Sequence, residues 1–241
     1  MKWNENYKIR FQDTDKNETA SISTLFKLIQ ETAMRQMKAQ SPSYEELVMQ
    51  DKAFVLSAIR IELYSQVYAY DDVVASTWAC PSRGYNFNRC YDIKKGDELI
   101  CEASSVWALV SLSEKKLFTV NDIDLSSFCK DEQLTFDRGI RVRIPGAIPL
   151  NLIGEYTAKY SDVDLNGHVN NTNYPRILCD FIPNIENIRI RSMGIYFAND
   201  LKMGETVKIY MAKIGEKIFF RTVRNDDLKT NIEAEIIIEL N

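Results

Sequence analysis

The stretch SDVDLNGHVNN, residues 161–171, holds the only histidine of the chain, His168, among aspartates and asparagines. Histidine titrates near neutral pH and is the side chain best suited to act as a general base there. Asp164 and Asn166 lie within four residues of His168 and could orient its ring or hold a water molecule. The same polar residues could instead bind a cation. The stretch is therefore compatible with two kinds of chemistry, proton transfer and metal binding.

The calcium interpretation starts from Asp162, Asp164, Asn166 and Gly167, which copy the opening D-x-[DN]-x-[DN]-G of an EF-hand loop. Such a loop needs a bidentate glutamate at its twelfth position, and counting from Asp162 that position is Asn173. The segment before the loop is also short and strand-like, whereas an EF-hand begins with a helix. We therefore expect no calcium site. One histidine and scattered cysteines offer too few ligands for zinc, so no metal is expected.

The polar loop has a counterpart earlier in the chain. YKIRFQDTDKNETAS, residues 7–21, aligns without a gap with YTAKYSDVDLNGHVN, residues 156–170, so that position 7 matches position 156 at an offset of 149. The acids and the asparagine occur in both copies, but Thr19 stands opposite His168. This asymmetry is what one active site would leave after a duplication. The residues alone leave both a structural and a catalytic role open for His168.

A helical segment follows each copy of the loop. After the first copy, apolar residues recur at helical spacing over residues 22–37, and Ser21 or Ser23 can cap this helix. After the second copy, residues 174–181 predict a shorter helix that Pro183 ends. Each polar loop is therefore expected to lead into a helix.

Strand-like stretches fill most of the remaining chain, because β-branched and aromatic residues are frequent and several stretches alternate apolar with polar residues. They comprise residues 53–64, 72–79, 85–93, 98–111, 188–197, 206–214, 216–224 and 231–240. Each half thus consists of a strand, a polar loop, a helix and four or five antiparallel strands, which predicts an α+β fold. Gly, Pro and charged residues make 126–150 a connector between domains 1–125 and 151–241. Two such copies suggest a fused pseudo-dimer.

The composition excludes several other classes of protein. With 45% hydrophobic and 27% charged residues the chain is typical of globular proteins, and a net charge of −4 gives no support to nucleic-acid binding. Neither a G-x-x-x-x-G-K-[ST] nor a G-x-G-x-x-G motif occurs. The N-terminal residues do not look like a signal peptide, and no apolar run has the length of a membrane span. We expect a cytoplasmic protein with reduced thiols at Cys80, Cys90, Cys101, Cys129 and Cys179.

DLNGHVNNTNY, residues 164–174, closely resembles the D-x-N-x-H-V-N-N-x-x-Y signature of the acyl-acyl carrier protein thioesterases. This family of plant plastid and bacterial enzymes is built from two hot-dog folds. FKLIQETA (26–33), FVLSAIRIEL (54–63) and SSVWALVSLSEKKL (104–117) resemble landmarks of its first domain in the same order. The resemblance covers nearly the whole chain. It implies a tandem (double) hot-dog fold, with an antiparallel sheet and a long helix packed against it in each half.

The resemblance also implies a set of catalytic residues. Asp164, Asn166 and His168 correspond to the core of the family's site. A glutamate on a later strand is the fourth residue of that site, and plant members have a cysteine directly after it. If Asp200 is the matching position, the residue after it is Leu201 and not a cysteine, so we expect no covalent cysteine mechanism.

The position of the fourth site residue depends on how IYFANDLKMGE, residues 195–205, is aligned. Aligning the Gly-Glu pair at its end with the family pattern places Asp200 at the glutamate, whereas aligning Tyr196 places Asn199 there. We predict Asp200, because that alignment keeps a carboxylate and preserves the spacing to the Gly-Glu pair.

The activity implied by the resemblance is hydrolysis of fatty acyl-acyl carrier protein thioesters by a water that His168 or Asp200 deprotonates, without a cofactor. Backbone N–H groups over residues 169–171, with Asn170 and Asn171, are expected to contact the substrate and stabilise the oxyanion. The acyl chain needs an apolar slot, which the resemblance places in the first hot-dog beneath the long helix. Candidate lining residues are Phe26, Ile29, Met34, Met37 and Trp107.

The expected partner is an acyl carrier protein with a phosphopantetheine-linked acyl chain. Because carrier proteins are strongly acidic, a basic rim is expected, to which RGIRVR (138–143) and RIR (189–191) could contribute. Two alternatives stay open: a hot-dog thioesterase that acts on coenzyme A esters, and an acyl-binding module without activity. A homodimer is also compatible with the sequence.

Overall fold

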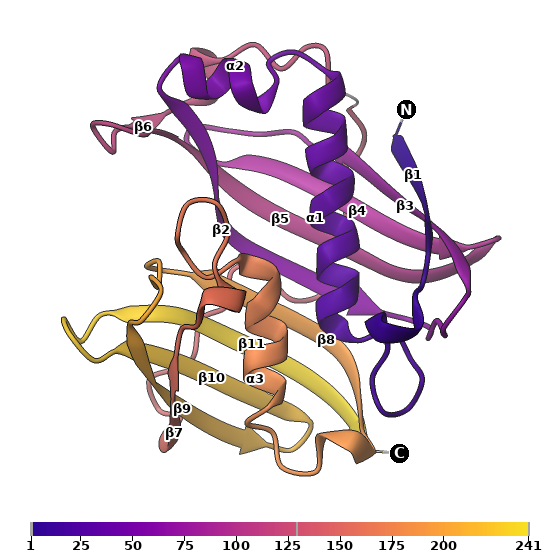
Figure 1. Cartoon of the computed structure of the whole chain (residues 1–241), viewed down its shortest axis with the longest axis vertical. Coiled ribbons are helices and arrows are strands. Elements are labelled where there is room, and N and C mark those ends of the chain that lie inside the picture. The colour runs from indigo at the N-terminus through magenta and orange to yellow at the C-terminus, as the bar shows by residue number, and fades with distance from the viewer. Residues whose placement is uncertain (1, 129, 241) are drawn as a thin grey trace. The chain divides into compact units, whose positions relative to one another are not determined.

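Alternating apolar residues build one antiparallel sheet in each half of the chain, and a helix lies across each sheet (Figure 1). The structure, a computed structural model, describes residues 2–128 and 130–240. It separates into unit 1, Met1–Ile140, and unit 2, Arg141–Asn241. The α+β class with an antiparallel sheet and a helix in each half, predicted from the repeat, is confirmed.

The strands of unit 1 pair in the order β1-β3-β4-β5-β2, and β6 pairs with β5. They are β1 (Trp3–Lys8), β2 (Lys52–Leu63), β3 (Asp72–Ala79), β4 (Phe87–Lys95), β5 (Glu98–Ser111) and β6 (Leu117–Phe118). The helices are α1 (Ile22–Ala39) and α2 (Tyr44–Met49), with short 3₁₀ turns η1 (Phe11–Asp13) and η2 (Val120–Asp122). The sequence predicted β3 and β5 at their observed bounds, and β2 and β4 are shifted only at their ends.

Helix α1 begins where the sequence predicts. The Ser21 side chain caps it by accepting a hydrogen bond from Thr24 N at 3.1 Å. Its buried apolar face, which includes Phe26 and Ile29, packs against β1 and β3. Helix α2 was missed, although Ser43 and Glu46 form a capping box, the S-x-x-E pattern that can be read from sequence.

Unit 2 repeats this order, with its strands paired as β8-β11-β10-β9-β7. The strands are β7 (Asn151–Thr157), β8 (Ile188–Phe197), β9 (Thr206–Ile214), β10 (Lys217–Arg224) and β11 (Thr230–Leu240). The helix is α3 (Tyr174–Cys179), with 3₁₀ turns η3 (Tyr160–Asp162), η4 (Asn171–Asn173) and η5 (Ile185–Asn187). Thus β7 takes the place of β1, β9 of β3, β10 of β4, β11 of β5 and β8 of β2.

The core of unit 2 follows the predicted alternation in β11, where Ile232, Ala234 and Ile236 are buried. Helix α3 is shorter than the predicted 174–181 and much shorter than α1, since Asp180 already forms its C-terminal cap. The second copy therefore keeps the arrangement of the first with less helix.

The predicted connector, 126–150, contains no helix and no strand among the residues that the structure describes. Its first part is bound to unit 1, since Trp78 Nε1 donates to Glu132 O at 2.8 Å and Gln133 Nε2 donates to Ser104 Oγ at 2.6 Å. The division between the units falls after Ile140. The exact limits of the connector stay a prediction.

The described cysteines, Cys80, Cys90, Cys101 and Cys179, form no disulfide. Cys129, also expected to be a reduced thiol, lies outside the described residues. In residues 2–128 and 130–240, no helix combines the length and the apolar character needed to cross a membrane.

Candidate active site

The loop that contains His168 is a closed turn held by its own backbone. Asp164 N donates to His168 O at 2.9 Å, and Gly167 N donates to Asp164 O at 3.0 Å. Gly167 has φ +75°, a left-handed conformation that glycine adopts without strain. The Asp164 carboxylate accepts the backbone N–H of Asn166 at 2.8 Å, which closes an Asx turn. Asp164 therefore shapes the loop through its side chain.

Two further backbone bonds fix this loop in unit 2. Val169 N donates to Leu201 O at 2.8 Å, and Asn170 N donates to Asp162 O at 2.9 Å. His168 also forms an isolated antiparallel bridge with Lys202. The loop thus lies along the segment between β8 and β9, which includes both residues considered for the fourth site position.

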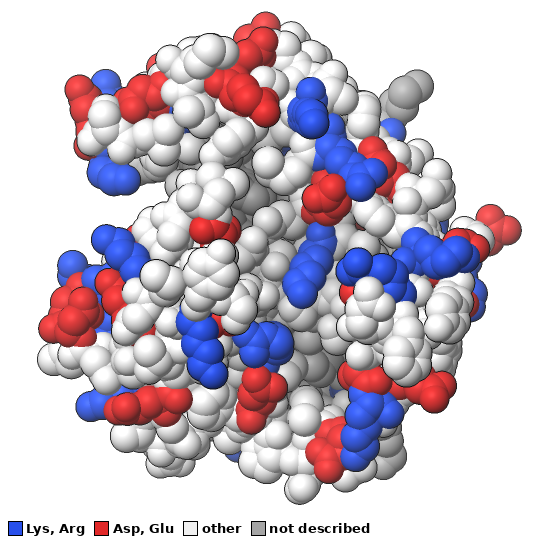
Figure 2. Space-filling view, viewed as in Figure 1, with Lys and Arg blue, Asp and Glu red and all other residues white. Residues whose placement is uncertain are grey.

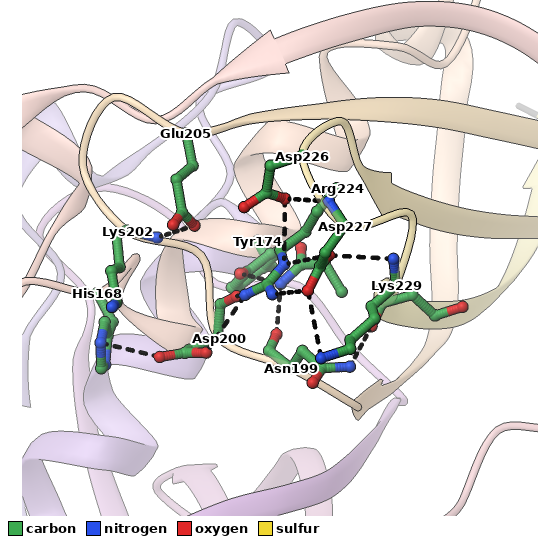
Figure 3. Close-up of polar contacts among 12 residues, drawn as sticks. His168, Tyr174, Asn199, Asp200, Lys202, Glu205, Arg224, Asp226, Asp227 and Lys229 are labelled. Carbon is green, nitrogen blue, oxygen red and sulfur yellow. Dashed lines mark hydrogen bonds and ion pairs between the residues drawn. The ribbon is translucent and has the colours of Figure 1, made fainter.

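His168 and Asp200 point toward one another across these two segments (Figure 3). His168 Nε2 lies 2.9 Å from Asp200 Oδ2, and their side chains are 37% and 46% exposed, so both can reach solvent and substrate. Asn199 faces elsewhere, because its Nδ2 donates to Thr230 O at 2.7 Å. Of the two candidate positions, the structure brings Asp200 to the histidine.

Unit 1 contains the same loop framework. Asp15 N donates to Thr19 O at 2.8 Å, Glu18 N donates to Asp15 O at 3.0 Å, and the Asp15 carboxylate accepts Asn17 N at 2.8 Å. Glu18 has φ +62° where unit 2 has a glycine. These contacts match those of the His168 loop one by one, so the repeat found in the sequence is confirmed in the backbone.

The two loops differ in the side chains that they present. The residue after Thr19 donates its N–H to Val67 O at 2.8 Å, as the residue after His168 donates to Leu201 O. Val67 therefore corresponds to Leu201, and the preceding residue, Gln66, corresponds to Asp200. Unit 1 has Thr19 and Gln66 where unit 2 has an imidazole and a carboxylate, so only unit 2 can perform acid–base chemistry with this pair.

Asp162 is buried and saturated with hydrogen bonds. Its carboxylate accepts from Tyr156 Oη at 2.6 Å and from Lys159 N at 2.8 Å, and it forms an ion pair with Arg176 at 2.7 Å. Burial, together with the bond to Asp162, raises the pKa of the Tyr156 hydroxyl. Asp162 therefore joins the loop to β7 and α3 and has no oxygen directed at His168.

The asparagines after His168 are less available than predicted. The N–H groups of Val169 and Asn170 already bond to carbonyl groups, and the Asn170 side-chain oxygen caps η4 by accepting from Thr172 N at 3.0 Å. Among the described residues none accepts the N–H of Asn171. The predicted oxyanion donors are therefore reduced from residues 169–171 to Asn171. Asn166 stays exposed at the tip of the loop.

The candidate slot residues lie in unit 1. Phe26 and Ile29 are buried on the inner face of α1. Trp107, on β5, is half-buried, and its Nε1 donates to Ser105 Oγ at 2.7 Å. Met34 is 40% exposed, so it lies outside the apolar core, contrary to what helical spacing suggested. Met37 is half-buried.

The sequence analysis missed Asn231, a fully buried residue of β11 beside the site. Its Nδ2 donates to Asn199 O at 2.6 Å and to Tyr174 Oη at 3.0 Å, while its Oδ1 accepts from Thr222 Oγ1 at 2.9 Å. Burial raises the pKa of the Tyr174 hydroxyl. No signal in the sequence indicated its burial, because Asn231 lies in the same polar phase of the β11 alternation as Glu233 and Glu235. Asn231 connects α3 to the segment that presents Asp200.

Replacing Asn231 by leucine is expected to lower the free energy of unfolding by about 3 kcal/mol, because the hydroxyls of Tyr174 and Thr222 and the carbonyl of Asn199 would lose their buried partner. Urea denaturation followed by circular dichroism measures this change. Asn225→Leu, at an exposed position in the turn between β10 and β11, is the matched control and should change stability little. If the Asn231→Leu protein is as stable as the unsubstituted one, Asn231 does not have the connecting role described above.

The fold and the site together define a tandem hot-dog protein with one histidine–carboxylate pair. Two solved structures share this fold over almost the whole chain. An acyl-ACP thioesterase from Bacteroides thetaiotaomicron has a TM-score of 0.88 at 21% identity, covering 98% of this chain and 97% of that one. The 12:0-ACP thioesterase from Umbellularia californica has a TM-score of 0.86 at 15% identity, covering 100% and 98%.

The chain belongs to the acyl-ACP thioesterase family. Residues 1–126 match the acyl-ACP thioesterase N-terminal domain, and residues 149–239 match the C-terminal domain. A curated relative, the chloroplastic palmitoyl-acyl carrier protein thioesterase of Gossypium hirsutum, is 24% identical over 185 residues, which cover 71% of this chain and 45% of the relative. The chain spans about half the length of the curated relatives that it matches.

Proposed function

We propose that this protein hydrolyses fatty acyl-acyl carrier protein thioesters to a free fatty acid and the carrier protein. The observation that supports the proposal most directly is the 2.9 Å contact between His168 Nε2, in the signature loop of a family member, and Asp200 Oδ2, in the segment after β8. A general base held by a carboxylate and open to solvent is what hydrolysis by water requires.

We propose different roles for the two nitrogens of His168. With its N–H at Nε2 donated to Asp200, the neutral ring keeps a lone pair on Nδ1. Nδ1 takes a proton from water as the water oxygen attacks the thioester carbonyl carbon. When the tetrahedral intermediate collapses, the carbon–sulfur bond breaks and the imidazolium returns the proton to the departing thiolate. Asp200 stabilises the imidazolium between these two steps.

The other loop residues are proposed to prepare this reaction. Asp164 closes the turn that presents His168. The exposed Asn166 side chain positions the attacking water, and the N–H of Asn171 donates to the developing oxyanion. A thioester carbonyl is reactive enough toward water that no metal or cofactor is needed in this scheme.

We propose that the acyl chain is bound in unit 1, where Phe26 and Ile29 belong to the apolar core beneath α1. The acidic carrier protein is proposed to bind through scattered basic residues. On the face shown in Figure 2, the Lys and Arg side chains alternate with Asp and Glu and do not gather in one large patch. Local charge pairs, more than the net charge of −4, would therefore select the carrier.

Kinetics on matched substrates test the choice of carrier. Palmitoyl- and octanoyl-carrier protein are expected to give a higher kcat/KM than the corresponding coenzyme A esters, because beyond the phosphopantetheine arm the carrier protein offers a protein surface for contact, whereas coenzyme A offers only a nucleotide. Release of the free thiol, followed with a chromogenic disulfide, measures the rates. A preference for coenzyme A would instead identify an acyl-CoA thioesterase. Tight acyl binding without release of thiol would identify a non-catalytic acyl-binding module.

We also propose that the protein is cytoplasmic and that its oligomeric state is a homodimer. The absence of disulfides among the described cysteines supports a reducing compartment. Cell fractionation and light scattering after size-exclusion chromatography measure these two properties.

A further inference from the structure

Arg224, the last residue of β10, lies beside the catalytic acid, although nothing in the signature loop points to it. Its side chain is only 13% exposed, whereas the Asp200 side chain is 46% exposed. Its NH1 donates to the backbone oxygen of Asp200 at 3.2 Å and lies 3.7 Å from Asp200 Oδ1. The guanidinium thus contacts both the main chain and the carboxylate of one residue (Figure 3).

The other edge of the guanidinium is fixed by the turn between β10 and β11. Arg224 Nε donates to Asp227 Oδ1 at 3.0 Å, and NH2 donates to Asp227 Oδ2. The Asp227 carboxylate also accepts the backbone N–H of Lys229 at 3.1 Å. Hydrogen bonding with Asp227 raises the pKa of Arg224 and lowers the pKa of Asp227. Arg224 is therefore anchored on one side and meets Asp200 with the other.

The two oxygens of the Asp200 carboxylate have different neighbours. Oδ2 lies against His168 Nε2, and Oδ1 is the oxygen nearer to Arg224. Asp200 belongs to an irregular segment after β8, and a half-exposed carboxylate there has several accessible rotamers. A guanidinium that bonds the backbone and attracts Oδ1 favours the rotamer in which Oδ2 meets the imidazole.

We propose that Arg224 is a positioning residue for thioester hydrolysis, which acts through Asp200 by holding its carboxylate against His168. The inference rests on the proposed function, since it assigns Asp200 to the reaction. It adds a residue from a different part of the sheet to the set that the signature loop implies.

Unit 1 provides an internal comparison. Position 7 pairs with Val73 as its counterpart 156 pairs with Val207, so the next residues, Val74 and Lys208, are equivalent. Val74 pairs with Lys94 and Lys208 pairs with Val223, so Lys95 occupies the position of Arg224. Lys95 forms an ion pair with Asp71 at 2.8 Å. The unit that lacks the catalytic pair thus has a lysine bound to another acid. A lysine ammonium is a point charge, whereas the planar guanidinium can bond two separate groups at fixed angles. The arginine occurs in the unit that has an acid to position.

Replacing Arg224 by methionine is expected to lower kcat roughly ten- to a hundredfold with KM changed by less than about twofold, because a misplaced catalytic group slows the chemical step without weakening binding. Arg224→Lys should recover part of the loss through its charge. Arg221→Met is the matched control. Arg221 lies on the same strand, and its NH2 lies 2.6 Å from Glu233, away from His168 and Asp200, so this variant should keep kcat.

A double substitution separates positioning from a general structural role. In the Asp200→Ala background, Arg224→Met should change kcat by less than about twofold, since the group that it positions is gone. An equal loss of kcat in both backgrounds, or an unchanged kcat in Arg224→Met alone, overturns the inference. If Arg224→Met does not fold, Arg224→Lys can replace it in the same two-background comparison. It should then lower kcat by an intermediate amount in the unsubstituted protein and leave kcat unchanged in the Asp200→Ala protein.

Failure of this inference can be told apart from failure of the proposed function. If the unsubstituted protein hydrolyses no acyl thioester, or if His168→Ala is fully active, the proposed function is wrong. If hydrolysis depends on His168 and Arg224→Met keeps its kcat, only the role of Arg224 is wrong.

Discussion

Replacing His168 by alanine is expected to lower kcat for the hydrolysis of acyl-carrier protein thioesters by about 10³-fold, because the protein would lose the proposed general base. His168 is the only histidine of the chain, so no other imidazole can take its place. Its side chain is partly exposed and its backbone makes the bonds that close the loop, so alanine should leave the fold intact. Initial rates with saturating substrate measure kcat, and circular dichroism verifies folding.

The repeat supplies the control for this experiment. Thr19→Ala changes the equivalent position in unit 1, within the same backbone framework. It should keep kcat within about twofold, since it removes only a hydroxyl that bonds to Asp15. A His168→Ala protein with full activity would exclude the mechanism proposed above.

Replacing Asp200 by alanine is expected to reduce kcat by about 10²-fold, because the imidazole would lose the carboxylate that fixes its tautomer and stabilises its charged form. Asn199→Ala is the neighbouring comparison. The Asn199 side chain donates to Thr230 O, so its loss should lower the free energy of unfolding by about 1 kcal/mol and leave kcat nearly unchanged. Parallel measurement of kcat and urea unfolding on both variants distinguishes catalysis from stability.

The comparison also decides between the two alignments of this segment. A loss of kcat that is larger in Asn199→Ala than in Asp200→Ala would place the fourth site residue at Asn199. It would also remove the basis for the role of Arg224, because Arg224 contacts the oxygens of Asp200.

Much of the fold was predictable because its signals are local. Strand alternation and helical spacing depend on neighbouring residues, so β3, β5, β8 and β9 were found at their observed bounds. The repeat supplied the order of elements in each half. Helix α2 was missed because its six residues are too few to show a helical period, and its capping box, Ser43 and Glu46, is its only local signal. The short α3 shows that the second copy did not keep the helix length of the first.

The site was predictable only where its residues are close in sequence. The loop with His168 follows from one continuous stretch, whereas its partner comes from a segment whose register depends on the alignment. A shift of one residue exchanges Asp200 for Asn199, and neighbouring side chains in an extended segment point in different directions. Arg224 and Asn231 lie beyond further strands, and only the paired sheet brings them to the site.

The loop of unit 1 has the backbone of the His168 loop without its histidine and carboxylate side chains. Thr19 and Gln66 stand in the same network of backbone hydrogen bonds that presents His168 and Asp200 in unit 2. Backbone hydrogen bonds and one aspartate side chain thus hold this turn in both units, whichever residues stand at the positions of His168 and Asp200. Two side-chain positions, Thr19/His168 and Gln66/Asp200, therefore distinguish two loops whose backbone hydrogen bonds are the same.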